Sequence, residues 1–418
     1  MFLLNLFFKK LIQHGTLTIE EANGRRHVYE GPHPGGRAGI RLLDNTIAGQ
    51  MARSPRLQVP QAYVDGRLEI TEGTLYDFLE LCAINIELMD EQMQGSLLRW
   101  FMDSLTNFQH HNPLTRARKN VAHHYDLSGE LFDLFLDTDR QYSCAYFQNP
   151  DDDIETAQKQ KKRHLAAKLL LEPGQEVLDI GCGWGGLALY LASVADVKVT
   201  GLTLSTEQHA VATRRAEEAG LSDRVTFKLQ DYRNEDREYD RIVSVGMFEH
   251  VGNLHYREFF DKLRDLIKAD GLALIHTIGR SDRPAPINPW MRKYIFPGSY
   301  LPSLSQITPH IDRLGLWLTD MESLRLHYAE TLRLWNQTFQ AKRDYVSELY
   351  DEKFCRMWEI YLQGCETGFR HNRLTVFQLQ IAKQIDAVPM TRDYIPAFEQ
   401  RYPLLDTVMP PAADWASK

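Results

Sequence analysis

The stretch Glu176-Val177-Leu178-Asp179-Ile180-Gly181-Cys182-Gly183-Trp184-Gly185-Gly186 decides the fold of this 418-residue chain. Its first half predicts a buried strand over residues 177–180, and the apolar run that follows predicts a helix over residues 186–194. Glycines between a strand and a helix let the backbone turn tightly and approach a ligand closely. The stretch therefore predicts a strand, a turn and a helix of an α/β sheet, with a ligand bound at the turn.

Strands and helices continue to alternate after this stretch. Apolar runs predict strands over residues 197–202, 225–229, 242–245 and 272–277, and amphipathic runs predict helices over residues 206–219 and 256–267. Alternation at this spacing implies right-handed crossovers and a parallel sheet with helices on both faces. A helix over residues 153–171 leads into the sheet, and Pro173-Gly174 ends it.

The flanking regions give weaker signals. Before the sheet we predict a strand over residues 16–19, a loop across the glycine-rich run 31–39, a turn-rich connector over 63–70, and helices over 75–88 and 91–108. After it, the prolines of residues 284–309 predict an irregular insertion, and helices are expected over 330–350 and 352–369. A chain of 418 residues is too long for one ordinary core, so we expect at least two domains.

Composition excludes several classes of protein. Hydrophobic residues make up 43% and charged residues 25% of the chain, which is ordinary for a globular protein. The formal net charge of -8 argues against a strongly basic nucleic-acid binder. The five cysteines are odd in number and none is spaced as CxxC, so we expect neither a disulfide framework nor a metal site, and a reducing cytosol is the natural compartment.

The order of residues in the glycine loop indicates the kind of ligand. Asp179 precedes Gly181, Gly183 and Gly185, whereas a dinucleotide-binding loop has its acidic residue on the next strand. This order suits S-adenosylmethionine, which has an amino-acid portion and no phosphate. Asp179 would accept from the cofactor's ammonium group, while Gly181 and Gly183 admit it and Cys182 packs as a small side chain. The alternative is a phosphate-binding loop, since glycines alone are a weak signal.

Residues after the next two strands are candidates for the rest of the cofactor. Asp231, followed by Tyr232, can receive the adenine amino group, although a surface turn or a helix cap explains Asp231 equally well. The strand over 197–202 is not followed by the usual acidic ribose ligand. Thr203, Ser205 or Gln208 is expected to take that role.

Four more stretches carry a family resemblance. They are Asn120-Val121-Ala122-His123-His124-Tyr125-Asp126-Leu127, Gln141-Tyr142-Ser143-Cys144-Ala145-Tyr146-Phe147, Ser244-Val245-Gly246-Met247-Phe248-Glu249-His250-Val251-Gly252 and Tyr294-Ile295-Phe296-Pro297-Gly298. With the glycine loop, they resemble the cyclopropane-fatty-acid synthase family, which includes the mycolic acid cyclopropane synthases, over about residues 115 to 385. The resemblance implies an α/β class I S-adenosylmethionine-dependent methyltransferase fold, doubly wound around a mostly parallel seven-stranded sheet, with helical lid insertions. It also implies a smaller N-terminal domain over 1–110, for lipid binding or dimer support, and a catalytic domain over 111–418 that includes the C-terminal helices.

The family transfers a methylene unit from S-adenosylmethionine to a cis double bond of an acyl chain. Methyl transfer leaves a carbocation, which a base must deprotonate. In the family this base is a bound bicarbonate ion, and its pocket carries over here to Cys144, Glu249, His276, the backbone of Ile278, and Tyr328. Donors at His276 and Tyr328 suit a small anion, while Glu249 can accept from the bicarbonate hydroxyl. Taken alone, His276 reads as a satisfied buried histidine and Glu249 as a helix-capping carboxylate.

The resemblance assigns further site residues. Tyr142 and Ser143 match a segment that closes over the cofactor's amino-acid end. Cys365 matches a cysteine often proposed for the family's active site, and we interpret it as lining the pocket, because the chemistry needs no thiol nucleophile. Aromatic side chains are candidates for stabilising the cation, with plain core packing as the alternative: Tyr142, Tyr146, Phe147, Phe248, Tyr294, Phe296 and Tyr328.

Partners and location follow from the same resemblance. We expect an unsaturated phospholipid in a bilayer surface as the substrate, no nucleic acid, and a homodimer as one option for the assembly. Residues 1–8, 116–119 and 159–163 are apolar or basic segments that can meet an anionic bilayer. The alternatives are a first helix packed on its own domain and two solvated helix faces. The expected location is the cytoplasm, peripherally associated with the inner face of the membrane.

Two other readings stay open. One is a relative that leaves a methyl branch or a methylene on the acyl chain, or that methylates a small amine. The other is a lipid-binding protein that has lost catalysis. The intact glycine loop and the complete base pocket favour the cyclopropane synthase.

Overall fold

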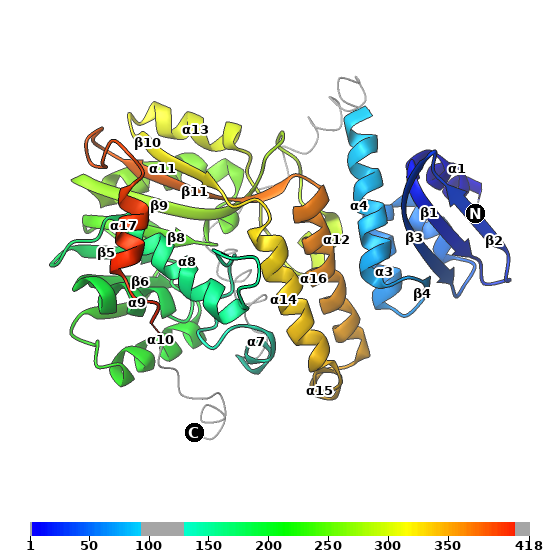
Figure 1. Cartoon of the computed structure of the whole chain (residues 1–418), viewed down its shortest axis with the longest axis horizontal. Coiled ribbons are helices and arrows are strands. Elements are labelled where there is room, and N and C mark those ends of the chain that lie inside the picture. Colours follow the sequence, from blue (N-terminus) through cyan, green and yellow to red (C-terminus); the bar gives the residue numbers. More distant parts are fainter. Residues whose placement is uncertain (1, 93–128, 406–418) are drawn as a thin grey trace. The chain divides into compact units, whose positions relative to one another are not determined.

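The computed structural model describes residues 2–92 and 129–405, which form two compact units (Figure 1). The first unit contains the described residues of Met1–Gln109, Ala285–Pro297 and Leu332–Leu374. The second contains those of His110–Pro284, Gly298–Thr331 and Thr375–Lys418. The predicted division at residue 110, like the helix predicted over 91–108 beyond Gln92, lies outside the described residues and stays a prediction.

The secondary structure runs in chain order as follows: α1 (Phe2–Leu11), β1 (His14–Glu20), β2 (Arg26–Glu30), β3 (His33–Leu42), α2 (Ile47–Arg53), α3 (Pro55–Val64), β4 (Leu68–Glu72), α4 (Leu75–Gln92), α7 (Gly129–Phe135), α8 (Ile154–Leu169), β5 (Glu176–Ile180), α9 (Gly186–Ala195), β6 (Lys198–Thr203), α10 (Thr206–Glu218), β7 (Val225–Leu229), β8 (Tyr239–Val245), α11 (Tyr256–Leu266), β9 (Ile267–Arg280), α12 (Pro289–Tyr294), α13 (Leu304–Arg313), β10 (Trp317–Ser323), α14 (His327–Ala341), α15 (Arg343–Leu349), α16 (Glu352–His371), β11 (Leu374–Ala382) and α17 (Tyr394–Arg401). Short 3₁₀ turns lie at Tyr232–Asn234, Phe248–His250 and Asn253–His255.

The second unit contains the predicted sheet. Its seven strands lie in the order β10-β11-β9-β8-β5-β6-β7, and the five strands from β5 to β9 pair in parallel. The α/β fold and the mostly parallel seven-stranded sheet are therefore confirmed, and each of the five strands predicted from apolar runs is present. The residue pattern missed β10 and β11, which pair antiparallel at one edge.

Helices cover both faces of this sheet (Figure 1) because successive strand residues point to opposite sides. Val177 and Leu272 pack into a core with helices α8, α9, α10 and α17. Their neighbours Leu178 and Ala273 pack into a second core with α11 and α13. Nearly continuous apolar strands are expected when both faces are buried. The doubly wound arrangement brings the carboxyl ends of the parallel strands to one edge.

Buried charges on α8 correct the surface prediction for residues 159–163. Lys161 is 1% exposed and Lys162 is fully buried, so neither side chain can contact a bilayer. Lys162 pairs with Asp139 at 2.5 Å, and Arg215 pairs with the same carboxylate. Burial of an ion requires partners, and here they come from a segment some twenty positions earlier and from α10. A polar helix face was therefore mistaken for a solvated one.

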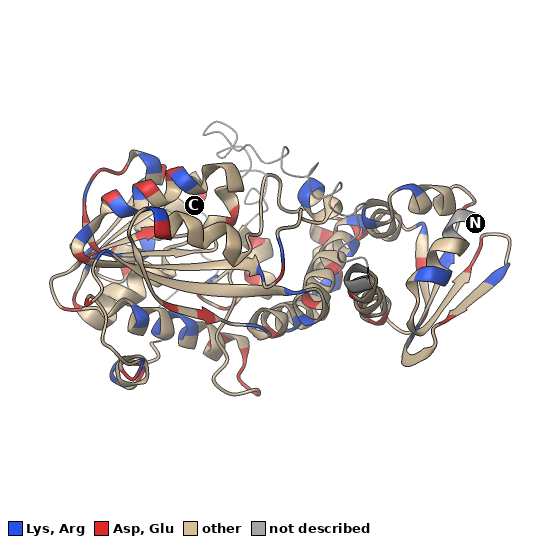
Figure 2. Ribbon diagram, turned by 90° about the horizontal axis from the view of Figure 1, so that it is seen from above, with Lys and Arg blue, Asp and Glu red and all other residues tan. Residues whose placement is uncertain are grey.

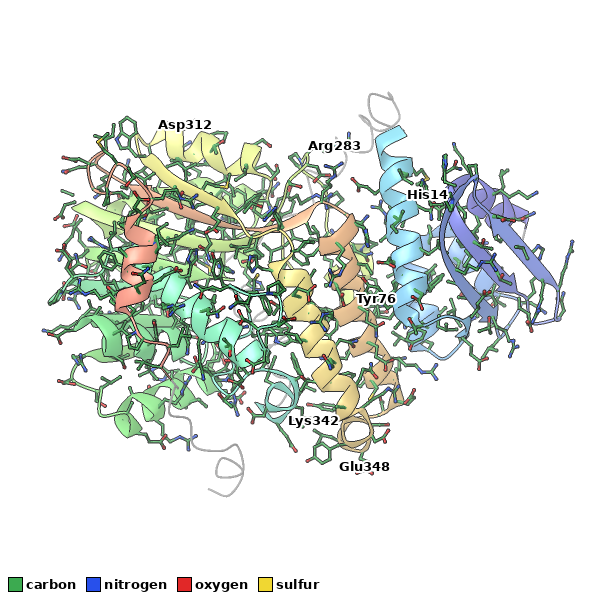
Figure 3. All side chains as sticks on the ribbon, viewed as in Figure 1. His14, Tyr76, Arg283, Asp312, Lys342 and Glu348 are labelled. Carbon is green, nitrogen blue, oxygen red and sulfur yellow. The ribbon has the colours of Figure 1, made fainter. Side chains whose placement is uncertain are left out.

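The first unit has a four-stranded sheet in the order β2-β1-β3-β4. Its strand β3 corrects the loop predicted across the glycine-rich run 31–39. The glycines are needed because β1 and β3 approach closely: Gly15 has φ +77°, and a Cβ on Gly35 would lie 2.8 Å from the Gly15 nitrogen. Glycine in this strand marks close backbone packing and not a turn. His14, labelled in Figure 3, packs against His33 with ring centroids 4.8 Å apart and the rings tilted by 31°.

The N-terminal helix packs on the core of its own unit. Phe8 and Leu11 of α1 are buried in the hydrophobic cluster formed with β1 and β3, whereas Leu6 is 63% exposed. Polar contacts join α16 to the N-terminal residues of this unit: the Tyr63 hydroxyl donates to Glu359 at 2.9 Å. Of the helices among residues 2–92 and 129–405, none is long and apolar enough to cross a bilayer.

The proline-rich residues 284–309 are less irregular than predicted. They contain all of α12 and the first part of α13. Pro289 is compatible with α12 because it lies in the first turn of the helix, where the backbone N–H is not needed for an intrahelical hydrogen bond. The helix predicted over 330–350 is divided into α14 and α15 at Lys342. Lys and Arg are interspersed with Asp and Glu along the helices of both units (Figure 2).

Candidate active site

A pocket lies in the second unit at the carboxyl ends of four parallel strands, β5 to β8. This is where doubly wound sheets bind ligands. The residues that line it come from the loops after these strands: Ile180, Gly181, Gly183, Leu202, Thr203, Leu204, Gln208, Gln230, Asp231, Tyr232, Arg233, Val245, Gly246, Met247, His250 and Val251. Most are apolar or neutral, with one ion pair at one end.

Asp179 fits the ammonium group of an amino-acid ligand. Its side chain is 2% exposed, and its Oδ2 atom has no hydrogen-bond partner. Burial raises the pKa of Asp179 to about 7, partly offset by the positive charge of Lys161. A buried carboxylate oxygen without a partner is costly, so a cationic ligand group at this position would stabilise it.

The glycine loop turns at three left-handed positions, Gly181, Gly183 and Gly185. A Cβ on Gly181 would lie 2.9 Å from the Cβ of Met247, so this position has no room for a side chain. Gly183 has no neighbour within 4 Å on that side and lines the pocket. The loop therefore combines a tight turn with an open face where a ligand can approach the backbone.

Replacing Gly185 by alanine is expected to destabilise the chain. Gly185 has φ +84°, and a Cβ there would lie 2.6 Å from Phe227 Cζ and 3.0 Å from Ala212 Cβ. Backbone strain and overpacking together should lower the free energy of unfolding by about 2–3 kcal/mol. Chemical denaturation measures this. Gly183→Ala is the matched control, because its new methyl group meets open space and should lose less stability; an equal loss in both variants would contradict the packing argument.

The adenine and ribose candidates lie along β6 and β7. Asp231, 2% exposed, accepts two hydrogen bonds from the Arg233 guanidinium, at 2.9 and 2.8 Å, and lines the pocket beside Tyr232. Thr203 donates to the Gln208 side chain at 2.9 Å, and both line the pocket. Ser205 is the N-cap of α10 and is not among the lining residues. Thr203 and Gln208 therefore suit the ribose better than Ser205 does.

The segment Gln141–Cys144 is held beside α8 and forms no part of the lining described above. Ser143 Oγ accepts from Lys161 Nζ at 2.8 Å. The Tyr142 ring packs edge-on against Phe132, with centroids 5.2 Å apart. Gly185 and Cys182 also lie outside the lining, and Cys182 packs in the hydrophobic core on the α8 side of the sheet.

Glu249 and His276 lie next to the pocket, the first in the turn after β8 and the second within β9. Glu249 follows β8 between Met247 and His250, and its Oε1 accepts from the Ile278 N–H at 2.6 Å. Its Oε2 is buried without a partner, and burial raises the pKa of Glu249 to about 7, against the effect of the Ile278 hydrogen bond. Pairing of β8 with β9 places the His276 backbone beside Val245, and Gly246 N–H donates to the His276 carbonyl at 2.9 Å.

His276 is a neutral donor in this arrangement. It is 2% exposed, and burial holds its pKa well below the usual value. The amide nitrogen of Gln378 lies 3.2 Å from His276 Nδ1. In this orientation of the Gln378 amide, which leaves its Oε1 buried without a partner, Nδ1 accepts and the ring proton is on Nε2. His276 therefore has an N–H to offer a small anion.

The two cysteines of the predicted site are protonated thiols. Burial raises the pKa of Cys144 well above its usual range, and its Sγ donates to the Ala145 carbonyl at 3.3 Å. Cys365 lies on α16 in the first unit, and burial raises its pKa to about 12. Neither is a thiolate nucleophile at neutral pH. The place of Cys365 in the site stays a prediction. Tyr328, at the start of α14 in the second unit, is 7% exposed.

Two of the aromatic candidates for cation stabilisation pack against other rings. Tyr146 is stacked between His164, 4.1 Å from centroid to centroid, and His327, at 4.9 Å, so both faces of its ring are covered. Phe248 is fully buried and stacks on Tyr256 at 4.6 Å. A ring must expose a face to attract a cation. Both residues therefore correspond to the core-packing alternative.

Several residues in or around the site were not predicted from the sequence. Met247, Gly246 and His250 line the pocket, and burial lowers the pKa of His250 to about 4. Their signal was present, since they flank Glu249 in the quoted motif. Gln378 and Lys161 gave none, because their partners are far away in sequence. The motif over residues 120–127 and the basic run 116–119 lie outside the described residues.

The chain is similar to known proteins over most of its length. A family model described as mycolic acid cyclopropane synthetase matches residues 112–379. The chain is 42% identical over 353 residues to the cyclopropane-fatty-acyl-phospholipid synthase of Escherichia coli (strain K12), covering 84% of this chain and 89% of that protein. It is 35% identical over 360 residues to a probable fatty acid methyltransferase of Pseudomonas putida, covering 84% and 88%. A solved structure of mycolic acid cyclopropane synthase CmaA1, complexed with SAH and CTAB, superposes with a TM-score of 0.60 at 35% identity, covering 63% of this chain and 97% of that one.

Proposed function

The chain belongs to the mycolic acid cyclopropane synthetase family and is an S-adenosylmethionine-dependent transferase, and from this premise we propose that it builds cyclopropane rings in phospholipid acyl chains. In this proposal a methylene unit passes from the cofactor to the cis double bond of an unsaturated acyl chain. The phospholipid acceptor is supported by the name of the Escherichia coli relative, whose likeness covers most of both chains.

Glu249 carries the proposal. Methyl transfer to an alkene leaves a carbocation, and a ring closes only when a proton leaves the new methyl group. A base is therefore needed close to the cofactor. Glu249 is buried beside the pocket with one carboxylate oxygen unpartnered. Methylation of an amine, which is itself a good nucleophile, would not require a buried base for a carbon-bound proton.

We propose that a bicarbonate ion completes this base. When bound, it would supply a small basic oxygen beside Glu249. The residues present fit such an anion: His276 offers its Nε2–H and Glu249 Oε2 is a free acceptor for a hydroxyl. Cys144 would add only its buried sulfur surface, because its S–H already donates to the Ala145 carbonyl. The Ile278 N–H already donates to Glu249, so this backbone group orients the carboxylate. Tyr328 would add a phenol from α14.

Depleting bicarbonate is expected to slow turnover. In buffer purged of carbon dioxide, the rate should fall about tenfold at saturating cofactor and lipid, because a general base contributes at least that much. Added bicarbonate should restore the rate. Lipid product measured by gas chromatography checks this, and binding of S-adenosylhomocysteine is the control that should not change. A rate independent of bicarbonate would remove the ion from the proposal and leave Glu249 as the base.

We also propose that the chain works at a bilayer surface. A phospholipid acyl chain is presented by a membrane, so the enzyme must reach one. Exposed Leu6 on α1, followed by Lys9 and Lys10 in the last turn of that helix, suits contact with anionic lipid. The homodimer remains an option of the same proposal.

A methyl-branching reaction is the second candidate. The probable fatty acid methyltransferase of Pseudomonas putida is 35% identical to this chain over 84% of its length, so a branched product is supported by one relative. The two reactions share the cofactor and the cation and differ in where the proton is lost. In our proposal Glu249 and the bicarbonate take the proton from the new methyl group.

Mass spectrometry of the product decides among these reactions. The chain is incubated with labelled S-adenosylmethionine and vesicles of a monounsaturated phospholipid, and the fatty acids are then released. We expect a gain of one CH2 with loss of the alkene. A gain with the alkene kept would support branching, and transfer to amines without transfer to lipid would contradict the proposal.

A further inference from the structure

Two buried side chains of α8 hold the segment that carries Tyr142, Ser143 and Cys144. The Gln158 amide donates to the backbone carbonyls of Gln141 and Ser143, at 3.1 and 2.9 Å. Lys161 donates to the side chains of the same two residues, at 2.5 and 2.8 Å. Gln158 is fully buried and Lys161 is 1% exposed. The segment has no regular secondary structure, and these four hydrogen bonds hold it together with those of Gln141 to Asp137 and Asp139.

Lys161 differs from its charged neighbours in having neutral hydrogen-bond partners. Lys162 and Arg215 both pair with the Asp139 carboxylate. Among the residues that the structure describes, no carboxylate forms an ion pair with Lys161, whose partners are an amide oxygen and a hydroxyl. Burial lowers the pKa of Lys161 to about 8, opposed by the charge of Asp137. Asp139 also opposes the effect of burial, but its carboxylate pairs directly with Lys162 and Arg215. A buried cation that makes no direct ion pair of its own suits an anionic ligand.

The charge of Lys161 acts on the same groups that the cofactor and the base pocket use. It favours the ionised forms of Asp179 and Cys144 and disfavours protonation of His276. Asp179 is the buried carboxylate with an unpartnered oxygen, and it directly precedes the lining residues Ile180 and Gly181. Lys161 makes its direct hydrogen bonds to neutral groups only. One negative and one positive buried group that act on each other form a charge pattern complementary to a zwitterion.

The amino-acid end of S-adenosylmethionine is such a zwitterion, with its ammonium and carboxylate on one carbon. Asp179 suits the ammonium, so the carboxylate must lie next to it. An ammonium group only donates, and the Ser143 oxygen therefore accepts from Lys161 and directs its own hydroxyl hydrogen elsewhere. A carboxylate is the strongest acceptor that this hydroxyl can meet.

We propose that Lys161, acting through the Ser143 hydroxyl, is the positive charge that binds the carboxylate of the cofactor. Lys161 is a positioning residue: it orients Ser143 and supplies the counter-charge, while Ser143 makes the contact. The inference rests on the cofactor dependence of the family and not on the acceptor or on bicarbonate. In this proposal the two side chains have different roles: both hold the segment, but only Lys161 contributes a charge.

A pair of ligands tests the charge directly. S-adenosylhomocysteine has the carboxylate, and S-adenosyl-3-thiopropylamine lacks it but keeps the ammonium. In Lys161→Met, isothermal titration calorimetry should show at least tenfold weaker binding of S-adenosylhomocysteine and less than twofold change for the analogue. Gln158→Met is the matched control, because it loosens the segment without removing charge and should weaken both ligands by a similar factor.

The comparison of two ligands within one variant separates recognition from a folding defect, which would affect both alike. If Lys161→Met does not fold, Lys161→Gln keeps the hydrogen bond to Ser143, removes the charge and should show the same selectivity. Equal weakening of both ligands, or no weakening of either, would overturn the proposal. Because the assay contains no lipid and no acceptor, failure to form a cyclopropane ring would leave this result unaffected.

Discussion

Glu249→Gln is expected to lower kcat by about 10² to 10⁴ while the Kd of S-adenosylhomocysteine changes by less than about threefold. Glutamine has the size of glutamate, so the Ile278 N–H keeps an oxygen acceptor at the same place. What is lost is the negative charge on Oε2, the buried atom without a partner. The loss should therefore appear in the chemical step, measured as lipid product at saturating cofactor.

The pH profile of this variant gives the control. Burial raises the pKa of Glu249 to about 7, so the wild-type carboxyl is protonated below that pH. If the ionised form is required, kcat at saturating cofactor rises with pH up to about 7 and is level above it. The kcat of the glutamine variant should not rise with pH in this range. An equal loss of kcat and of cofactor binding would show that Glu249 belongs to the cofactor pocket and not to the base.

Asp179→Asn is expected to weaken S-adenosylhomocysteine binding by between about thirtyfold and several thousandfold, the range for removing one partner of a buried charged pair. Asparagine keeps the shape of the side chain and removes the charge that would bind the ammonium. Stability should be retained or should rise, because an uncompensated buried carboxylate is unfavourable in the free chain. Isothermal titration calorimetry and chemical denaturation measure the two quantities.

The same residue predicts how affinity depends on pH. Burial raises the pKa of Asp179 to about 7, and only the ionised carboxylate attracts the ammonium. Below pH 7 the Asp179 carboxyl is protonated and must lose its proton before the ammonium binds. Wild-type affinity should therefore fall by about tenfold for each unit by which the pH drops below 7. Asp179→Asn should show no such dependence. A wild-type affinity that is constant from pH 5 to 8 would mean that Asp179 does not contact the ammonium.

The central strands of the fold could be predicted because burial on both faces makes them continuous apolar runs. β11 was not predicted because two fully buried glutamines interrupt its run of apolar residues. Gln378 contacts His276, and Gln380 donates to the Lys168 carbonyl. β10 was not predicted because its residues are mostly exposed or half-buried and show no apolar alternation. Both strands depend on tertiary partners that no local pattern reveals.

The candidate site was predictable where residues are close in sequence. The glycine loop and the motif around Glu249 are local, and the structure brings Glu249 to Ile278 through the pairing of β8 with β9. The contribution of Lys161 was not predictable, since a basic residue on a polar helix reads as solvated. Only the fold shows that Lys161 is buried and that it donates to Gln141 and Ser143.

Deuterium retention is the most direct measurement of the central claim, that a base beside the cofactor removes a proton from the transferred methyl group. The full chain is incubated with S-adenosylmethionine carrying a CD3 group and with vesicles of a monounsaturated phospholipid. The account predicts a saturated ring that keeps two of the three deuterium atoms, with the third released to water. A branched product that keeps all three deuterium atoms would contradict it.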